Sequence, residues 1–383
     1  MIPFNKPYLS GKEIDYIREA VSNGHVSGNG FFTKECHNLF EKKFGFEKCL
    51  LTTSCTDALE MAAILSNIEP GDEVIMPSFT FVSTANAFVL RGARVVFADS
   101  NLLNPNIDAS LIEGLITQKT KAIVGVHYAG VACDMETITK IASRHNLIVI
   151  EDAAQAIDSY YKGKPLGSFG HLAAFSFHET KNIQCGEGGM LVVNDKLFAR
   201  RAEIIWEKGT NRAEFFRGEV KKYGWVDVGS SFLPSDMIAA FLLAQLENLQ
   251  KIQHRRLKIW NRYYQNLKHI AGKGLVKLPF IDEFATNNAH MFYLLCNDEK
   301  QRNGLIKHLR DNGFLAVFHY LPLHKSEFYK NLHDGSELPN SVRYSQTLIR
   351  LPFFFELPDN DIDRMCELVG RFFSPPIQTT TMD

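Results

Sequence analysis

Short apolar runs alternate with amphipathic segments through the first half of the chain. The runs are rich in Val, Ile and Phe, and turn residues such as Pro70 and Gly71 separate them. We predict strands at residues 49–53, 73–76, 95–98, 122–126, 147–151, 173–177 and 190–193. Continuous apolar content is typical of strands buried on both faces, so we expect a mostly parallel sheet covered by helices.

Helical spacing of apolar residues predicts helices at 57–65 and 135–145, between the strands. A longer helical pattern covers residues 235–262 and leads into a second, smaller unit. In that unit we expect two strands and two helices, at residues 291–295, 316–319, 301–312 and 361–372.

The chain has 383 residues, which is too long for one typical hydrophobic core. We therefore predict an α/β protein with a large domain over residues 14–245 and a small domain over 246–383. Residues 1–13 are expected to pack nearby, and 375–383 to form a disordered tail.

Composition narrows the possible partners. The net charge is -1 and no basic block is present, so nothing indicates nucleic acid or an anionic membrane surface. The seven cysteines are scattered without a Cys-x-x-Cys pair, which disfavours disulfides and zinc and fits a reducing cytoplasm. The first residues lack a signal-peptide core, and the apolar run at 237–244 is too short to span a membrane.

Lys181 is the first candidate for chemistry. It follows the predicted strand 173–177 and precedes the glycine-rich segment 186–189. Open α/β sheets bind ligands beyond the carboxyl ends of their strands, so Lys181 is expected at the functional edge of the sheet. The alternative is an ordinary surface lysine, one of 42 Lys and Arg residues.

Asp152 ends the predicted strand 147–151 and is expected at the same edge. A lysine and an aspartate placed in this way suit pyridoxal phosphate (PLP). The lysine can hold the aldehyde as a Schiff base, and the carboxylate can keep the pyridine nitrogen protonated. Gln155 could reach the phenolic oxygen of the cofactor. The alternatives are a helix N-cap for Asp152 and a solvated helix residue for Gln155.

A phosphate site is expected where residues 53–56 lead into the helix at 57–65. Ser54, Cys55 and Thr56 offer hydroxyl, thiol and free N–H groups at a helix N-terminus, and Ser176 could add a second hydroxyl. The alternative is a plain N-cap by Ser54. Phe81 is a candidate stacking face for the pyridine ring, although most of the 29 phenylalanines must be core residues.

Several motifs occur together and in order. They are Gly-Asp-Glu-Val-Ile-x-Pro at 71–77, Glu-Asp-Ala-Ala-Gln at 151–155 and Ser-Phe-x-x-x-Lys at 176–181. With these motifs the chain resembles the DegT/DnrJ/EryC1/StrS family over nearly its whole length. The resemblance implies PLP-dependent sugar-nucleotide aminotransferases of the aspartate-aminotransferase fold (type I). This fold has a large domain with a mixed, mostly parallel sheet and a smaller C-terminal α/β domain.

The resemblance also implies roles for individual residues. Lys181 would be the Schiff-base lysine and proton shuttle, Asp152 the pyridinium partner and Phe81 the stacking ring. Gln155 would contact the phenolic oxygen, and the phosphate would be held by Ser54, Cys55, Thr56 and Ser176. The family's sites lie at a homodimer interface, where an asparagine of the partner subunit contacts the phosphate. In this sequence Ser231 occupies that place.

Substrate contacts are less well defined by the sequence. Arg212, Arg217 and Lys221 are candidates for the pyrophosphate of a sugar nucleotide, or they belong to a solvated charged loop. His319, Tyr320 and His324 are candidate substrate contacts. His178, His319 and His324 lack the spacing of a zinc motif, so we expect no metal site.

The segments 76–92, 126–133, 175–182 and 207–218 resemble family members that act on dTDP-4-keto-6-deoxy-D-glucose. The resemblance implies transfer of an amino group from L-glutamate to the 4-keto carbon, giving a dTDP-linked deoxyamino sugar for lipopolysaccharide or another surface polysaccharide.

Four alternatives are weighed against this activity. The acceptor could be a 3-keto or another 4-keto sugar nucleotide. The chain could be a non-catalytic regulator with a PLP fold, although both Lys181 and Asp152 are present. A related sugar dehydratase would carry histidine in place of Lys181. A nicotinamide dehydrogenase would require Gly-x-Gly-x-x-Gly after the first strand, which residues 51–55 do not offer.

Overall fold

The computed structural model describes residues 1–374. A seven-stranded sheet forms the centre of the larger unit, in the order β1-β9-β8-β5-β4-β2-β3. Its strands are β1 (Lys48–Thr52), β2 (Glu73–Pro77), β3 (Arg94–Ala98), β4 (Thr120–Val126), β5 (Ile148–Asp152), β8 (Leu172–Ser176) and β9 (Gly189–Val193). Strand β9 runs antiparallel to both neighbours, and the other pairs are parallel. The seven predicted strands and the mostly parallel sheet are confirmed.

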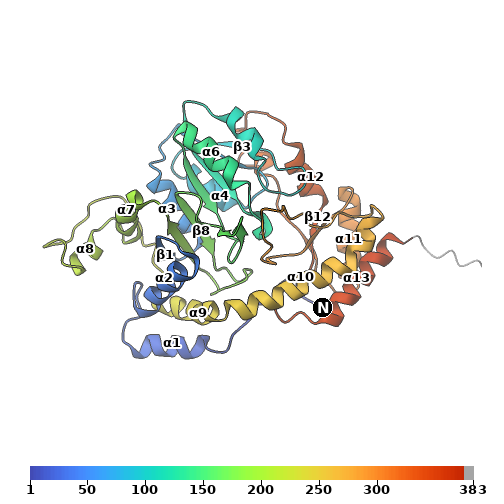
Figure 1. Cartoon of the computed structure of the whole chain (residues 1–383), viewed down its shortest axis with the longest axis horizontal. Coiled ribbons are helices and arrows are strands. Elements are labelled where there is room, and N and C mark those ends of the chain that lie inside the picture. Colours follow the sequence, from blue (N-terminus) through green and yellow to red (C-terminus); the bar gives the residue numbers. More distant parts are fainter. Residues whose placement is uncertain (375–383) are drawn as a thin grey trace, which may run out of the picture.

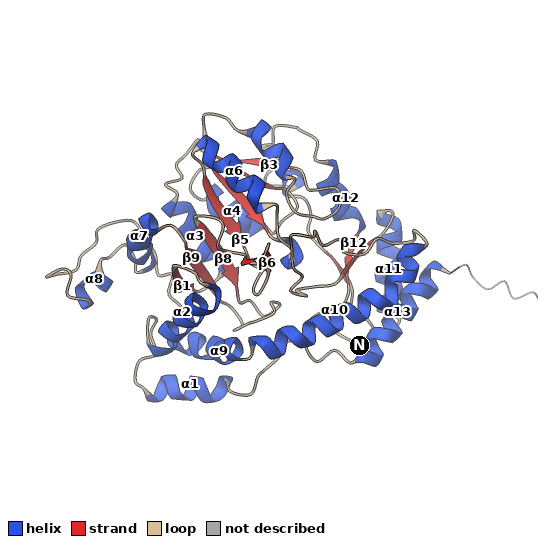
Figure 2. Cartoon of the chain, in the orientation of Figure 1, coloured by secondary structure: helices blue, strands red, loops and turns tan. Residues whose placement is uncertain are grey.

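Successive residues of a strand pack against different helical layers. In β9, Met190 and Val192 belong to a core shared with α2 (Phe31–Phe44), α6 (Met135–His145) and α9 (Asp236–Glu247). Leu191 and Val193 face the opposite core, formed with α3 (Cys55–Leu65), α4 (Val82–Val89) and α7 (Lys196–Trp206). The sheet is therefore covered on both sides, as its apolar strands require (Figure 2).

The carboxyl ends of six strands lie at one edge of the sheet, and β3, which ends at Ala98 beside Pro77, is the outermost of them. The other five strands end at Thr52, Pro77, Val126, Asp152 and Ser176. The antiparallel strand β9 begins at this edge, where Gly189 pairs with both Thr52 and Ser176. The loops that follow β1, β5 and β8 are thereby brought side by side.

The smaller unit is built on a three-stranded antiparallel sheet in the order β10-β12-β11. Its strands are β10 (Tyr293–Leu295), β12 (Leu348–Arg350) and β11 (Val317–Phe318). Helices α11 (Glu299–Asp311) and α13 (Asp359–Phe373) share a core with this sheet. The two strands and two helices expected here are confirmed with shifted ends, whereas α12 (Pro339–Thr347) and β12 were not predicted.

Helix α10 (Leu249–Gly272) connects the two units (Figure 1). Its first turns contribute Leu249 and Ile252 to the larger core, and Ile259 and Leu267 belong to the smaller core. The helical pattern predicted over 235–262 is confirmed, but it forms two successive helices. Helix α9 ends at Asn248, whose side chain donates to the carbonyl of Ala244 at 2.9 Å, and α10 starts immediately afterwards.

The N-terminal segment lies on the smaller unit. Ile2 pairs with Phe314, and the carbonyl of Phe4 accepts a hydrogen bond from the N–H of Phe353 at 3.0 Å. Figure 1 accordingly places the N-terminus close to α13. The boundary between domains 14–245 and 246–383 stays a prediction. The expected disorder of 375–383 concerns residues outside the described part of the chain.

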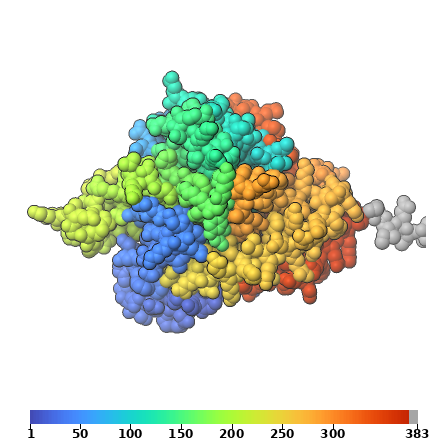
Figure 3. Space-filling model, viewed as in Figure 1, coloured from blue at the N-terminus to red at the C-terminus, as the bar shows by residue number. Residues whose placement is uncertain are grey.

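The remaining elements lie at the periphery. They are α1 (Glu13–Ser22), α5 (Ala109–Ile112), α8 (Arg212–Phe216), three short 3-10 helices at Glu113–Leu115, Tyr128–Gly130 and Leu323–Lys325, and the hairpin of β6 (Tyr160–Tyr161) and β7 (Lys164–Pro165). Figure 3 shows the yellow-green segment around α8 projecting from the body. No helix among residues 1–374 combines the length and apolar character that crossing a membrane requires.

Candidate active site

A cavity of about 520 Å³ opens at the sheet edge where the strand ends meet. It brings together ten of the residues singled out in the sequence. They are Ser54, Cys55, Thr56, Phe81, Asp152, Gln155, Ser176, Lys181, His319 and Tyr320. Residues separated by more than 260 positions along the chain thus face one space, which has the size of a small-molecule site.

Lys181 lies in the turn that follows β8, where its N–H donates to the carbonyl of His178 at 2.9 Å. Its side chain lines the cavity, so the surface-lysine alternative is wrong. Burial lowers the pKa of the amine, and the nearby Cys55 and Asp152 oppose this effect only in part. A lysine with a lowered pKa is neutral for a larger fraction of time and is therefore a better nucleophile and base.

Asp152 is the last residue of β5 and is almost fully buried. Its carboxylate accepts hydrogen bonds from the hydroxyl of Thr84 at 2.7 Å and from the N–H of Ala154 at 3.1 Å. The residues after Asp152 form turns and no helix, so the N-cap alternative is wrong. The carboxylate is held in one orientation toward the cavity.

The N-terminus of α3 forms another wall of the cavity. The hydroxyl of Ser54 caps the helix by accepting from the N–H of Asp57 at 3.1 Å, so the N-cap reading of Ser54 is confirmed. Other N–H groups of a first turn lack acceptors within their helix and attract anions. A Cβ added to Gly189 would lie 2.4 Å from the amide nitrogen of Cys55, so this helix start approaches β9 only because residue 189 is glycine.

Two further predicted contacts have defined surroundings. The ring of Phe81 is 56% exposed at the cavity, so it is no core residue and has a free face. Gln155 is buried, and its amide oxygen accepts from the N–H of Ala129 at 2.6 Å while its amide nitrogen donates to the hydroxyl of Tyr320 at 3.2 Å. The solvated-helix alternative for Gln155 is therefore wrong.

The sequence reasoning missed several cavity residues, among them Thr84, His290 and Arg350. His290 is buried, and its Nδ1 donates to the side-chain oxygen of Asn182 at 2.9 Å. The amide nitrogen of Asn182 already donates to Gln253 and to the carbonyl of Asn288, so its oxygen must be the acceptor. The Nδ1 atom of His290 therefore carries a proton, and in the neutral ring Nε2 does not. Burial also lowers the pKa of this ring well below its ordinary range.

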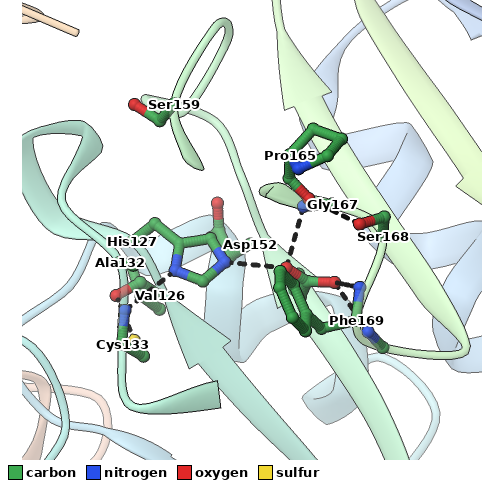
Figure 4. Close-up of polar contacts among 12 residues, drawn as sticks. Val126, His127, Ala132, Cys133, Asp152, Ser159, Pro165, Gly167, Ser168 and Phe169 are labelled. Carbon is green, nitrogen blue, oxygen red and sulfur yellow. Dashed lines mark hydrogen bonds and ion pairs between the residues drawn. The ribbon is translucent and has the colours of Figure 1, made fainter. Parts of the chain in front are cut away.

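A buried carboxylate beneath the cavity fixes the end of β5. Glu151 accepts hydrogen bonds from His127 Nε2 at 2.9 Å and from the N–H groups of Gly167, Phe169 and Gly170 at 2.8, 2.7 and 2.6 Å. Figure 4 shows the His127 ring between Cys133 and the loop that carries Gly167 and Phe169. Burial would raise the pKa of Glu151, but the donors around it outweigh burial and lower that pKa.

Five predicted contacts lie outside this cavity, and one of them, Lys221, is exposed. Ser231, Arg212 and Arg217 line a separate hollow of about 800 Å³, and Arg217 is already paired with Glu203 at 3.0 Å. His324 lines a third hollow, where the ring bonds to the hydroxyl of Ser78 at 2.6 Å. Their roles stay predictions, since Ser231 was expected to act in the site of a partner subunit.

The residues of the cavity fit PLP. The amine of Lys181 can bond to the aldehyde, and the oriented Asp152 carboxylate suits the protonated pyridine nitrogen. The N-terminus of α3 with Ser54 and Thr56 suits the phosphate, since the positive end of the helix and the hydroxyl groups both favour an anion. All three groups line the same cavity.

Comparison with known proteins agrees with this chemistry. The profile of the DegT/DnrJ/EryC1/StrS aminotransferase family matches residues 7–370. The spore coat polysaccharide biosynthesis protein SpsC of Bacillus subtilis (strain 168) is 33% identical over 377 residues, which cover 96% of each protein. The aminotransferase TlmJ from Streptoalloteichus hindustanus has a TM-score of 0.89 and 28% identity, covering 97% of this chain and 98% of that chain. The PLP-form of Spr1654 from Streptococcus pneumoniae has a TM-score of 0.88 and 25% identity, covering 97% and 100%.

These likenesses span both units of the fold and the whole cavity. The resemblance inferred from the motifs at 151–155 and 176–181 is therefore confirmed, together with the aspartate-aminotransferase fold. The chain belongs to the DegT/DnrJ/EryC1/StrS aminotransferase family, whose members use PLP as cofactor.

Proposed function

We propose that this enzyme moves the amino group of L-glutamate to the 4-keto carbon of dTDP-4-keto-6-deoxy-D-glucose. The products are dTDP-4-amino-4,6-dideoxy-D-galactose and 2-oxoglutarate, as for the dTDP-4-amino-4,6-dideoxygalactose transaminase that segments 76–92 and 175–182 resemble. The observation that carries the transamination is the shared cavity of the Lys181 amine, the Asp152 carboxylate and the α3 N-terminus.

The role of Lys181 follows from its position and charge. A neutral amine can take a proton from the α-carbon of the bound amino acid and return it to a neighbouring carbon, as base and then as acid. Burial lowers the pKa of Lys181 and so favours the neutral form that accepts the proton. In the second half of the reaction the same amine delivers the proton to the sugar carbon from one side, which sets the stereochemistry.

Asp152 has an electrostatic role. When bound, PLP would supply an electron sink and carry the amino group from donor to acceptor. The carboxylate would keep the pyridine nitrogen protonated, and the hydrogen bond from Thr84 keeps the carboxylate in place. Phe81 would cover one face of the ring, and Gln155 would contact the phenolic oxygen. Cys55 and Ser176 would complete the phosphate site with Ser54 and Thr56.

We place the sugar against His319 and Tyr320, whose ring centroids lie 3.5 Å apart at the cavity. A homodimer would complete the site, with Ser231 of each subunit acting at the other. Apolar side chains on the projecting segment favour such an interface, since Trp225 is 84% exposed and Phe216 on α8 is 69% exposed. Arg212 on that segment is the candidate for the pyrophosphate, and His324 stays a candidate for the substrate.

We place the product in surface polysaccharide synthesis, lipopolysaccharide included, in the cytoplasm. The relative SpsC is named for spore coat polysaccharide biosynthesis, which is a process of the same kind. The seven cysteines are unpaired in the structure, as a reducing compartment requires.

The direct test is to incubate the PLP-loaded enzyme with L-glutamate and dTDP-4-keto-6-deoxy-D-glucose and to identify the product by NMR. An axial amine at C4, with one 2-oxoglutarate formed per amino sugar, is the expected result. Parallel reactions with the 3-keto isomer and with UDP-4-keto sugars measure selectivity. Faster conversion of any of these would replace the proposed acceptor and leave the transamination intact.

A further inference from the structure

Arg350 is a cation without a partner at the centre of the enzyme. It is the last residue of β12, and its side chain lines the cavity together with Lys181. No hydrogen bond or ion pair joins its guanidinium to any residue among 1–374, and its Nε is buried without an acceptor. Buried guanidinium groups are normally paired, because desolvating an unpaired charge is costly.

The carboxylates that line the cavity do not neutralise Arg350. Asp152 is bound by Thr84, and the Nδ1 of His319 bonds to the hydroxyl of Tyr128 at 2.7 Å. Glu187, the other carboxylate that lines the cavity, is largely exposed and lies 3.6 Å from His178. Neither carboxylate pairs with Arg350, so the guanidinium is available to an anion that enters from outside.

The surroundings of Arg350 hold the guanidinium in place. Strand β12 is the central strand of its sheet, and Arg350 pairs in register with Tyr293 on one side and Val317 on the other. The ring of Phe4 lies 4.5 Å from the guanidinium carbon. An aromatic ring at this distance stabilises the cation and restricts its movement, while the N–H groups stay free to bond.

Arg350 carries a permanent positive charge in the cavity, close to Lys181. Burial lowers the pKa of both His290 and His319 well below their ordinary range, so these rings are neutral at pH 7. A guanidinium stays charged under all ordinary conditions. The cavity therefore offers a fixed positive charge close to the reacting amine.

From this arrangement we infer that Arg350 binds a carboxylate of the amino-acid donor. The planar fork of a guanidinium matches a carboxylate with two parallel hydrogen bonds. In an amino acid the carboxylate is separated from the amine by one carbon, so a cation close to Lys181 suits this substrate. In the sugar nucleotide the pyrophosphate lies across the sugar ring from C4, further from the lysine. The inference rests on the proposed transamination and adds the group that recognises its amino donor.

The test measures binding without turnover. Glutarate has the carbon chain and both carboxylates of glutamate but no amine, so its binding to the PLP-loaded enzyme can be followed by titration calorimetry. Arg350→Met should weaken glutarate binding by about 30-fold or more, as expected when one partner of a buried ion pair is removed. Arg350→Lys keeps the charge but loses the fork, and should recover part of the affinity.

Arg343→Met is the matched control. Arg343 also has a buried Nε without an acceptor, but it lines the hollow beside α12 and not the cavity. This variant should bind glutarate like the wild type.

The rates of the two half-reactions provide a second measurement. Arg350→Met should raise the half-saturating concentration of L-glutamate by a similar factor, while the pyridoxamine-phosphate-loaded variant converts the keto-sugar at nearly the normal rate.

Each possible outcome either supports the role of Arg350 or overturns it. Equal glutarate affinity in the wild type and Arg350→Met, or no glutarate binding by the wild type, overturns the inference. A weakened keto-sugar half-reaction with unchanged glutamate binding would assign Arg350 to the sugar nucleotide and also overturn it. If the wild type binds glutarate through Arg350 but does not convert the keto-sugar, the role of Arg350 stands and the proposed acceptor is rejected. If Arg350→Met does not fold, Arg350→Lys supplies the same comparison.

Discussion

The hydroxyl of Thr84 donates a 2.7 Å hydrogen bond to the carboxylate of Asp152. Both side chains are buried, and Thr84 lies in the first turn of α4 while Asp152 ends β5. The same Thr84 oxygen lies 2.8 Å from the hydroxyl of Thr80, so the threonine is itself held. Hydrogen bonds through Thr80 and Thr84 thus orient the Asp152 carboxylate, which would contact the pyridine nitrogen.

Thr84→Val tests this relationship, because valine has the shape of threonine without the hydroxyl. We expect kcat/KM to fall roughly tenfold to hundredfold, since a hydrogen bond to a charged group contributes about 1.5 to 3 kcal/mol. Thr84→Ser should retain most of the activity. Equal activity of Thr84→Val and the wild type would remove the orienting role.

Asp152→Asn should lose more activity than Thr84→Val, with kcat/KM at least about a hundredfold below that of the wild type, because an uncharged partner leaves the pyridine a poor electron sink.

Gly189→Ala tests the approach of α3 to the sheet. The new Cβ would lie 2.4 Å from the backbone of Ser54 and Cys55, which cannot move without shifting the helix start. We expect PLP affinity, measured by equilibrium dialysis, to fall at least about tenfold, which corresponds to about 1.4 kcal/mol.

The control for this variant is Gly114→Ala, where no atom lies within 4 Å of the added Cβ. It should bind PLP as the wild type does. Normal PLP affinity in Gly189→Ala would mean that the N-terminus of α3 does not hold the phosphate.

Part of the site could be predicted because its residues carry local signals. Lys181 and Asp152 follow apolar strands, and Ser54 precedes a helix, so each is placed by its own neighbours in the sequence. Arg350 and Thr84 have no such signal. Arg350 comes from β12 of the smaller sheet and Thr84 from α4 of the larger unit, so their meeting depends on contacts between distant segments.

The helices show the same limit. An apolar stripe over 235–262 predicts helix, and the structure divides it into α9 and α10 at Asn248. The change from the larger to the smaller core comes later, between Ile252 and Ile259 of α10. Strand β12 has three residues and follows α12 directly, which is too short for a periodic pattern to reveal. The strands with continuous apolar runs were therefore predicted, whereas β12 and helices such as α2 and α7 were not.

The buried carboxylate of Glu151 makes the stability of the fold depend on pH. The pKa of Glu151 is lowered from its ordinary value of 4.5, because the hydrogen bonds from His127, Gly170 and Gly167 outweigh burial, which would raise it. A carboxyl group with a lowered folded-state pKa stabilises the protein fully above pH 4.5. This contribution is lost as the pH falls through the lower, folded-state pKa. Glu151→Gln should cost roughly 3 kcal/mol at pH 7, because the amide leaves buried N–H donors without an acceptor.

The measurement is urea unfolding of the wild type and the variant between pH 3 and pH 7. The difference in free energy of unfolding should shrink below pH 4.5 as Glu151 becomes protonated. Glu136→Gln, at an exposed glutamate on α6, should leave stability within about 0.5 kcal/mol. A stability difference that persists unchanged at pH 3 would contradict the assignment of charge to Glu151.

Lys181→Ala should remove turnover by at least about a thousandfold while the protein stays folded. The exposed Lys121 provides a control, and Lys121→Ala should be fully active. Borohydride reduction of the wild-type, PLP-loaded enzyme followed by peptide mapping should place the pyridoxyl group on Lys181. A label on another lysine, or transamination by Lys181→Ala, would assign the role elsewhere.

The visible absorption spectrum of the PLP-loaded enzyme tests the central claim most directly. L-glutamate is added first and dTDP-4-keto-6-deoxy-D-glucose afterwards. We predict that the absorption band of the lysine-bound cofactor bleaches with glutamate and returns with the keto-sugar, in wild type but not in Lys181→Ala. A spectrum without this band after addition of PLP, or one that glutamate leaves unchanged, would contradict the account.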